Sequence, residues 1–160
     1  MKLGLSGVFM EHDETHTLVE VTTEQEAYRD LLNLRFRELR VPLGLTWSVD
    51  DLKWEQLERH FGMRLGEIWV GVCVVRELSG KAVKIRQVAI ASEYQGQHFG
   101  WLMMAQLLKL LGEEGVAEVE IHARKNVIGF YKKLGFQCQG PEFEEIGIRH
   151  RKMTRELEPV

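Results

Sequence analysis

The segment VKIRQVAIASEYQGQHFGW, residues 83–101, joins an apolar β-strand to a helix through a turn that contains two glycines. The first N–H groups of a helix have no acceptor within the helix, and the helix dipole adds positive potential at that end. Such a junction can bind phosphate without a lysine. Gly96 and Gly100 allow the backbone to turn and to approach a ligand closely. The segment therefore predicts a strand–turn–helix unit that holds a phosphorylated cofactor.

The chain on both sides of this segment alternates between predicted strands and predicted helices. Strands are expected at residues 17–21, near 63, and at 68–76, 82–91, 116–123, 136–138 and 147–153. A hairpin turn is expected at residues 79–81, where Ser-Gly-Lys separates two β-rich runs. Helices are expected after the glycine turn, as far as about residue 111 with Gly112 as the stop, and at residues 126–134 with Gly135 as the stop. The order predicts an α/β fold with a mixed sheet and a right-handed crossover between the strands that flank the glycine turn.

Two more helices are predicted in the first third of the chain. Residues 23–26, TEQE, fit a capping box, and the helix that follows has an apolar side formed by Tyr28, Leu31, Leu32, Leu34 and Phe36. Pro42 and Gly44 end that helix. Ser48 and Asp51 form a second capping box, which predicts a helix from residue 49 to about residue 59.

Size and composition indicate a globular protein of one domain, residues 1–160. Hydrophobic residues make up 44% and charged residues 28%, and the formal net charge is -3. The negative charge and the lack of a basic stripe argue against nucleic acid, and the apolar runs are too short to cross a membrane. Residues 1–10 lack a signal-peptide pattern, and Cys73 and Cys138 suggest reduced thiols rather than a disulfide. A cytoplasmic location is expected.

Two further motifs follow the glycine turn. Residues 126–136, NVIGFYKKLGF, come directly after a predicted strand, and residues 143–150, FEEIGIRH, lie near the end. In this order and spacing the three motifs resemble the GNAT superfamily of acyl-CoA-dependent N-acyltransferases. The ending is similar to a bacterial branch with a Phe-x-Glu-x-Gly-Ile-Pro-His tail, with Arg149 in place of the proline. The resemblance runs from about Gly66 to Met153, and more loosely over the N-terminal helices.

The resemblance implies a central, mostly antiparallel, twisted sheet with about four helices. It also implies direct transfer of an acetyl group from acetyl-CoA to a primary amine in a ternary complex. The residues expected to hold the coenzyme are Val88, Ala89, Ile90, Gln95, Gly96, Gln97, His98, Phe99, Gly100, Trp101, Asn126 and Tyr131. Arg124, Lys125, Lys132 and Lys133 are near enough to meet the 3′-phosphate, or form a solvated charged face. Asn126 either binds the pantetheine amides or caps the helix that follows.

His98 stands where the family usually has glycine. With a negative φ its N–H can still face the diphosphate, whereas a φ above zero would cost a histidine on the order of 1 kcal/mol relative to glycine. A protonated His98 could also add a contact to phosphate.

The resemblance implies that Tyr131 is the general acid for the coenzyme sulfur; the alternative is a packed aromatic. The identity of the general base is left open by the resemblance. Alternation along residues 116–123 puts Glu118, Glu120 and His122 on one face, so Glu120 and His122 are candidate catalytic residues. Glu145 and His150 in the tail motif are a second pair, and an ordered water is a third option.

The expected acceptor is a small-molecule or peptide amine, and a homodimer through the C-terminal strands fits the family. Trp47, Trp54 and Trp69 could line an amine pocket with Phe36 and Leu39, or pack in the core. His12, His16 and His60 show no metal-ligand spacing, so no metal is expected. The alternative function is a catalytically silent GNAT-like domain that binds or senses coenzyme A. A nucleotide-phosphate enzyme lacks its Gly-Lys-Ser/Thr signature here.

Overall fold

A computed structural model describes residues 16–158. They form two compact units, one of residues 16–74 with Gln87–Met103, the other of Val75–Arg86 with residues 104–158. The predicted single domain over residues 1–160 stays a prediction. Residues 1–10, for which no signal-peptide pattern is expected, and His12 lie outside the described residues.

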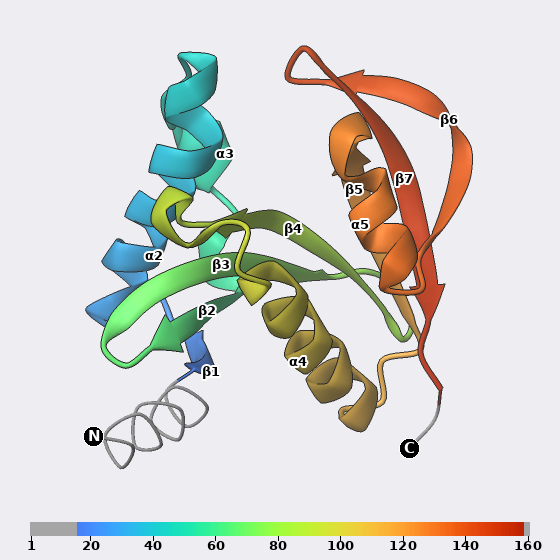
Figure 1. The fold of residues 1–160 in the computed structure, drawn as a ribbon, viewed down its shortest axis with the longest axis horizontal. Coiled ribbons are helices and arrows are strands. Elements are labelled where there is room, and N and C mark those ends of the chain that lie inside the picture. The colour runs from blue at the N-terminus through green and yellow to red at the C-terminus, as the bar shows by residue number, and fades with distance from the viewer. Residues whose placement is uncertain (1–15, 159–160) are drawn as a thin grey trace, which may run out of the picture. The chain divides into compact units, whose positions relative to one another are not determined.

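The strands form one seven-stranded sheet in the order β1-β2-β3-β4-β5-β7-β6 (Figure 1). Their bounds are β1 His16–Val21, β2 Arg59–Leu65, β3 Ile68–Glu77, β4 Ala82–Ile90, β5 Glu118–Arg124, β6 Gln137–Glu145 and β7 Ile148–Glu156. The α-helices are α2 Ala27–Arg35, α3 Val49–Leu52, α4 Phe99–Glu113 and α5 Ile128–Lys133. The sheet is mostly antiparallel, with β4 and β5 parallel. Within residues 16–158, the predicted mixed α/β fold with about four helices is confirmed.

The first unit packs α2 against apolar residues of the sheet. Its buried cluster contains Leu31 and Leu34 from α2, Val21, Val72 and Ala89 from β1, β3 and β4, and Ala91 directly after β4. Of the predicted apolar side, Leu31 and Leu34 are in the cluster and Tyr28 packs against it, whereas Leu32 and Phe36 are not part of it. The helical path continues after α2 through a π-helix at Phe36–Arg40 and a 3-10 turn at Val41–Leu43, and it ends at Gly44, whose φ is 69°. Pro42 and Gly44 thus mark the end, as expected.

Two predictions in this unit are wrong. The TEQE capping box does not form: the N-cap of α2 is Glu26 without a side-chain bond, and Gln25 instead accepts a bond from the Thr22 N–H. The Ser48–Asp51 capping box does form, but its helix ends at Leu52. Glu55 then turns inward to pair with Arg35, and residues from Arg59 onward form β2, which pairs with β1. Both long-range contacts override the local helical pattern.

The second unit is built on β5. The start of β4 pairs with it in parallel, from Ala82 opposite Glu118 to Ile85 opposite Ile121, and β7 pairs with it in antiparallel fashion. Val119, Ile121 and Ala123 are buried, whereas Glu118, Glu120 and His122 alternate with them on the other face, as predicted. In Figure 1, β6 and β7 form a long curved hairpin, and α5 packs against β5.

The helix that follows the glycine turn is longer than expected. Gly112 lies inside α4, and the chain leaves the helix at Gly115, whose φ is 93°. Gly135, with φ of 89°, follows α5 as predicted. Cys73 is buried on β3 and Cys138 is half-buried on β6, both as free thiols. No helix among residues 16–158 has the length and apolar character needed to cross a membrane.

Candidate functional site

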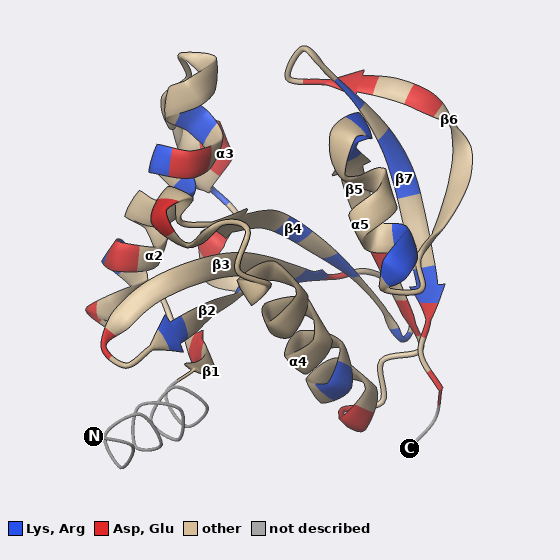
Figure 2. Cartoon of the chain, viewed as in Figure 1, with Lys and Arg blue, Asp and Glu red and all other residues tan. Residues whose placement is uncertain are grey.

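The junction between β4 and α4 carries a row of backbone N–H groups without acceptors. Within residues 16–158, the N–H groups of residues 96–101 donate no hydrogen bond, and the N–H of Leu102 is the first to do so, to the His98 carbonyl at 3.0 Å. Gly96 and His98 have φ of 79° and 67°. Residues 87–108 contain no Lys or Arg, and Figure 2 shows no blue on the turn between β4 and α4. The junction is therefore suited to an anion that is bound by main-chain amides.

Glu38 holds the start of this turn in place. Its carboxylate accepts hydrogen bonds from the N–H of Ser92 at 2.9 Å and from the Ser92 hydroxyl at 2.7 Å. Burial acts to raise the pKa of Glu38, but the bonds from Ser92 and from Arg37 outweigh it and lower the pKa. Sequence reasoning missed Glu38, because its partner lies 54 residues away and no local pattern marks the contact.

The end of β4 combines a buried segment with a strained residue. Ala89 is buried in the core cluster, while Val88 and Ile90 are half-buried. Gln95 donates its amide to the Ile90 carbonyl at 2.9 Å, which fixes the exit from the strand. Gln87 has φ of 55°, a left-handed conformation that is unusual for a residue other than glycine, and its Oε1 is buried with no partner among the described residues. Strain of this kind is often found next to functional sites.

Replacing His98 by glycine should stabilise the protein by up to about 1 kcal/mol, because glycine tolerates the positive φ that costs histidine energy. Affinity for the phosphorylated ligand expected at this turn should be equal or higher, since the N–H groups remain. Denaturant unfolding and calorimetry measure the two quantities. Ile146 is a matched control with φ of 47° in the β6–β7 turn: Ile146→Gly should also stabilise the fold but leave affinity for the phosphorylated ligand unchanged. A tenfold loss of affinity in His98→Gly would mean that the imidazole itself holds phosphate.

The two predicted pairs of candidate bases meet in one cluster of the second unit. Nδ1 of His122 on β5 lies 3.0 Å from Oε1 of Glu145 on β6, and its Nε2 lies 3.4 Å from Oε2 of Glu120. Nε2 of His150 on β7 lies 3.9 Å from Oε2 of Glu145. The separate predictions from the strand alternation and from the tail motif therefore converge on one place. A fifth member, Lys84 on β4, was not predicted, although it lies on the outward face of a strand whose alternation is visible in the sequence.

The cluster is partly shielded from solvent. The ring of Phe143 meets His122 edge-on at 4.9 Å between centroids and stacks on His150 at 5.9 Å. Burial acts to raise the pKa of Glu145, but the hydrogen bond and charge of His122 outweigh it and lower the pKa. Glu145 therefore favours the ionised form, which can orient an imidazole and stabilise it when it becomes charged.

The remaining predicted residues lie on or beside α5. Tyr131 is buried, with its ring edge-on to Phe130 and Phe136. Asn126 is exposed on the turn before α5 and does not cap that helix, whose N-cap is Val127. The alternative of Asn126 as a helix cap is therefore wrong. Lys125, Lys132 and Lys133 are exposed.

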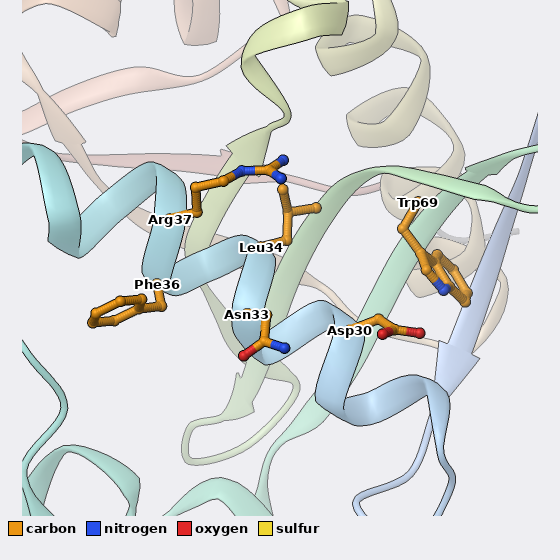
Figure 3. Close-up of a pocket in the computed structure, with 6 residues that line it drawn as sticks. All are labelled: Asp30, Asn33, Leu34, Phe36, Arg37 and Trp69. Carbon is orange, nitrogen blue, oxygen red and sulfur yellow. The ribbon is translucent and has the colours of Figure 1, made fainter.

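An open hollow of about 440 Å³ lies on the first unit, beside α2 (Figure 3). It is lined by Asp30, Asn33, Leu34, Phe36, Arg37 and Trp69. Phe36 and Trp69 were predicted to line an amine pocket. Trp47 instead lies beneath the guanidinium groups of Arg35 and Arg40, Trp54 is exposed, and Leu39 packs against the core. None of the residues predicted to hold the coenzyme lines this hollow. No group of His, Cys, Asp or Glu among residues 16–158 is arranged to hold a metal ion.

Comparison with known proteins identifies a family. Residues 51–157 match the family model described as the acetyltransferase (GNAT) domain. The uncharacterized protein YyaT of Bacillus subtilis is 32% identical over 78 residues, which are 49% of this chain and 53% of that protein. The chain spans about half the length of the curated relatives it matches.

Solved structures share the fold at low sequence identity. An acyl-CoA N-acyltransferase from Pseudomonas aeruginosa superimposes with a TM-score of 0.76 at 19% identity, over 88% of this chain and 99% of that one. A GNAT family acetyltransferase from Elizabethkingia anophelis, with acetyl-CoA bound, superimposes with a TM-score of 0.68 at 17% identity, over 90% and 99% of the two chains.

Proposed function

Because this chain belongs to the GNAT acetyltransferase family, we propose that it transfers an acetyl group from acetyl-CoA to a primary amine by direct attack in a ternary complex. The observation that carries the proposal is the row of backbone N–H groups at residues 96–101, which have no acceptor among the described residues. A diphosphate is the anion that such a row fits, because several amides can donate to it at once. Residues 87–108 contain no Lys or Arg, so the proposal assigns the diphosphate to the main-chain N–H groups.

The proposed coenzyme site uses the residues named from the sequence. Acetyl-CoA supplies the activated acetyl thioester. The backbone of residues 95–101 binds the diphosphate, and that of residues 88–90 binds the pantetheine arm and the acyl carbonyl. Glu38 supports the loop through Ser92. Asn126 adds a side-chain amide, exposed as a ligand contact requires.

The amine must lose a proton before it attacks. A lysine-like amine with a pKa near ~10.4 is protonated at pH 7, and supplying its neutral form costs about 4–5 kcal/mol. We assign this step to His122, with Glu145 and Glu120 as the carboxylates that stabilise the imidazolium after transfer. These residues support the assignment because a base and its orienting group lie within hydrogen-bond reach.

Replacing Tyr131 by phenylalanine should lower kcat severalfold or more and leave acetyl-CoA affinity nearly unchanged. The proposed role of its hydroxyl is to protonate the leaving thiolate, and phenylalanine keeps the ring that packs between Phe130 and Phe136. Stopped-time thiol release and calorimetry measure the two values. Phe130→Leu is the control for packing alone, with little effect on kcat expected. An unchanged kcat in Tyr131→Phe would remove the hydroxyl from the mechanism.

The proposed activity is tested by free-thiol release from acetyl-CoA across amines, amino acids, polyamines and lysine peptides. Release with at least one class of amine, together with an acetylated product of the expected mass, supports the enzyme. Coenzyme binding without release on any acceptor would favour the silent, coenzyme-sensing alternative. A homodimer through the C-terminal strands, a cytoplasmic location and a single domain over residues 1–160 remain predictions that go with this proposal.

A further inference from the structure

Two oppositely charged groups contact the same atom of His122. Nζ of Lys84 lies 3.2 Å from Nδ1, and Oε1 of Glu145 lies 3.0 Å from that nitrogen. Lys84 comes from β4 and Glu145 from β6, so two separate strands bring these charges to one side of the imidazole. All three residues belong to the second unit.

The two contacts need opposite protonation states. An ammonium can only donate, so Lys84 bonds to Nδ1 when that nitrogen carries a lone pair. A carboxylate can only accept, so Glu145 bonds to Nδ1 when it carries a proton. In the first state the ring proton is on Nε2, which faces Glu120 at 3.4 Å. Proton uptake at Nδ1 therefore breaks the bond to Lys84 and forms the bond to Glu145.

We propose that Lys84 keeps Nδ1 of His122 free of a proton at neutral pH, and that Nδ1 is the atom that takes the proton from the acceptor amine. The amine nitrogen keeps the electron pair with which it attacks the thioester, and Glu145 receives the new N–H. The proton then leaves to solvent, which reaches the ring because the His122 side chain is 22% exposed. Lys84 is thus a positioning residue that acts through His122. This inference rests on the proposed function.

The surrounding charges explain why such a residue is needed. Glu145 and Glu120 both face the imidazole and both favour its charged form, which cannot act as a base. Beyond them, Lys152 lies 3.5 Å from Glu120, and His150 lies 3.9 Å from Glu145. Among residues 16–158, Lys84 is the cation in direct contact with the ring. Its own pKa is lowered, mainly by burial and also by Arg86 and Arg76, against the opposing charges of Glu145 and Glu120.

The test is a nitrogen-15 NMR titration of the His122 imidazole in the free protein, which reads tautomer and protonation whether or not the protein turns over. In Lys84→Met the midpoint of the His122 titration should rise by about one pH unit, because no ammonium in contact with the ring then offsets the charges of Glu145 and Glu120. Lys84→Gln keeps a hydrogen-bond donor without the charge and should shift the midpoint similarly. Lys84→Arg should stay close to wild type. The acidic limb of the pH–rate profile should move with the midpoint, about tenfold in rate per unit.

Lys152→Met is the matched control, because it removes an ammonium that is 46% exposed and contacts Glu120 rather than the ring. In Lys152→Met the midpoint of the His122 titration should move much less than in Lys84→Met. A midpoint in Lys84→Met that is unchanged or lower would overturn the inference, as would a Lys84→Arg profile that matches Lys84→Met. Absence of thiol release in the wild type would overturn the proposed function instead. The midpoints of the His122 titration would still show whether Lys84 keeps the imidazole free of the extra proton.

Discussion

Replacing His122 by alanine should lower kcat by about 100- to 10,000-fold, the usual contribution of a positioned general base. The affinity for acetyl-CoA should change little, because the proposed role of His122 is proton transfer and the diphosphate is assigned to the backbone N–H groups of residues 96–101. The residual activity should rise about tenfold per pH unit up to the pKa of the amine, near ~10.4, because the acceptor must then lose its proton to solvent. Initial rates of thiol release between pH 6 and pH 10 measure both effects.

Glu118→Ala is the control for His122→Ala. Glu118 lies on the same strand and the same face, and it is exposed. Its removal should leave kcat and the pH profile as in the wild type. A His122→Ala protein with wild-type kcat at pH 7 would show that the proton leaves by another route, with Glu120, the pair of Glu145 and His150, or an ordered water as the remaining options.

Replacing Glu55 by glutamine should destabilise the protein by about 3–5 kcal/mol, because it leaves the buried Arg35 charge without a counter-ion. Arg35 donates to both carboxylate oxygens of Glu55, at 2.7 and 3.0 Å, and the two side chains are 2% and 6% exposed. Tyr28 donates to the same carboxylate at 2.7 Å. The Nε of Arg35 is buried with no hydrogen-bond partner among the described residues, so the hydrogen bonds of this guanidinium to Glu55 are made by its two terminal nitrogens. Urea unfolding at pH 7 measures the change.

The matched control is Glu20→Gln. Arg59 binds both oxygens of Glu20 at 2.8 Å, a geometry close to that of the buried pair, but these side chains are 30% and 42% exposed. A surface pair contributes about 0–1 kcal/mol, so this substitution should be nearly neutral. Equal losses in the two variants would contradict the role of burial.

The free energy of unfolding should also decrease as the pH falls into the acidic range, because of the Glu55 carboxylate. Burial acts to raise the pKa of Glu55, but the hydrogen bonds and charge of Arg35, with Tyr28 and His60, outweigh it, so the pKa in the folded protein lies below its ordinary value. The Arg35–Glu55 pair therefore contributes its full stabilisation at pH values above about 4.3, the pKa of a glutamate in the unfolded chain. This stabilisation is lost as the pH falls through the pKa of Glu55 in the folded protein. In Glu55→Gln this acid-dependent part should be absent.

The sequence predicts well what depends on neighbouring residues. Alternation placed Glu120 and His122 opposite Val119 and Ile121, because a strand with one buried face repeats every second residue. The Ser48–Asp51 box formed because both partners lie within one turn. The order of strands and helices followed from similar local patterns.

Contacts between distant residues could not be predicted in this way. The helix expected to reach residue 59 stops early because Glu55 pairs with Arg35, 20 residues away, and because the following residues pair with β1. Glu38 and Lys84 were missed for the same reason, since each acquires its role from a partner on another element. The tail motif and the strand alternation indicated separate bases, and the register of β5, β6 and β7 joined them.

The central claim is that main-chain N–H groups at residues 96–101 bind the diphosphate of coenzyme A. Isothermal titration calorimetry with coenzyme A and with pantetheine, which lacks the diphosphate, tests it most directly. The account predicts saturable binding of coenzyme A and at least about 100-fold weaker binding of pantetheine, because the charge-assisted bonds to phosphate are lost. Equal affinity for the two compounds, or no binding of coenzyme A or of its acetyl ester, would contradict it.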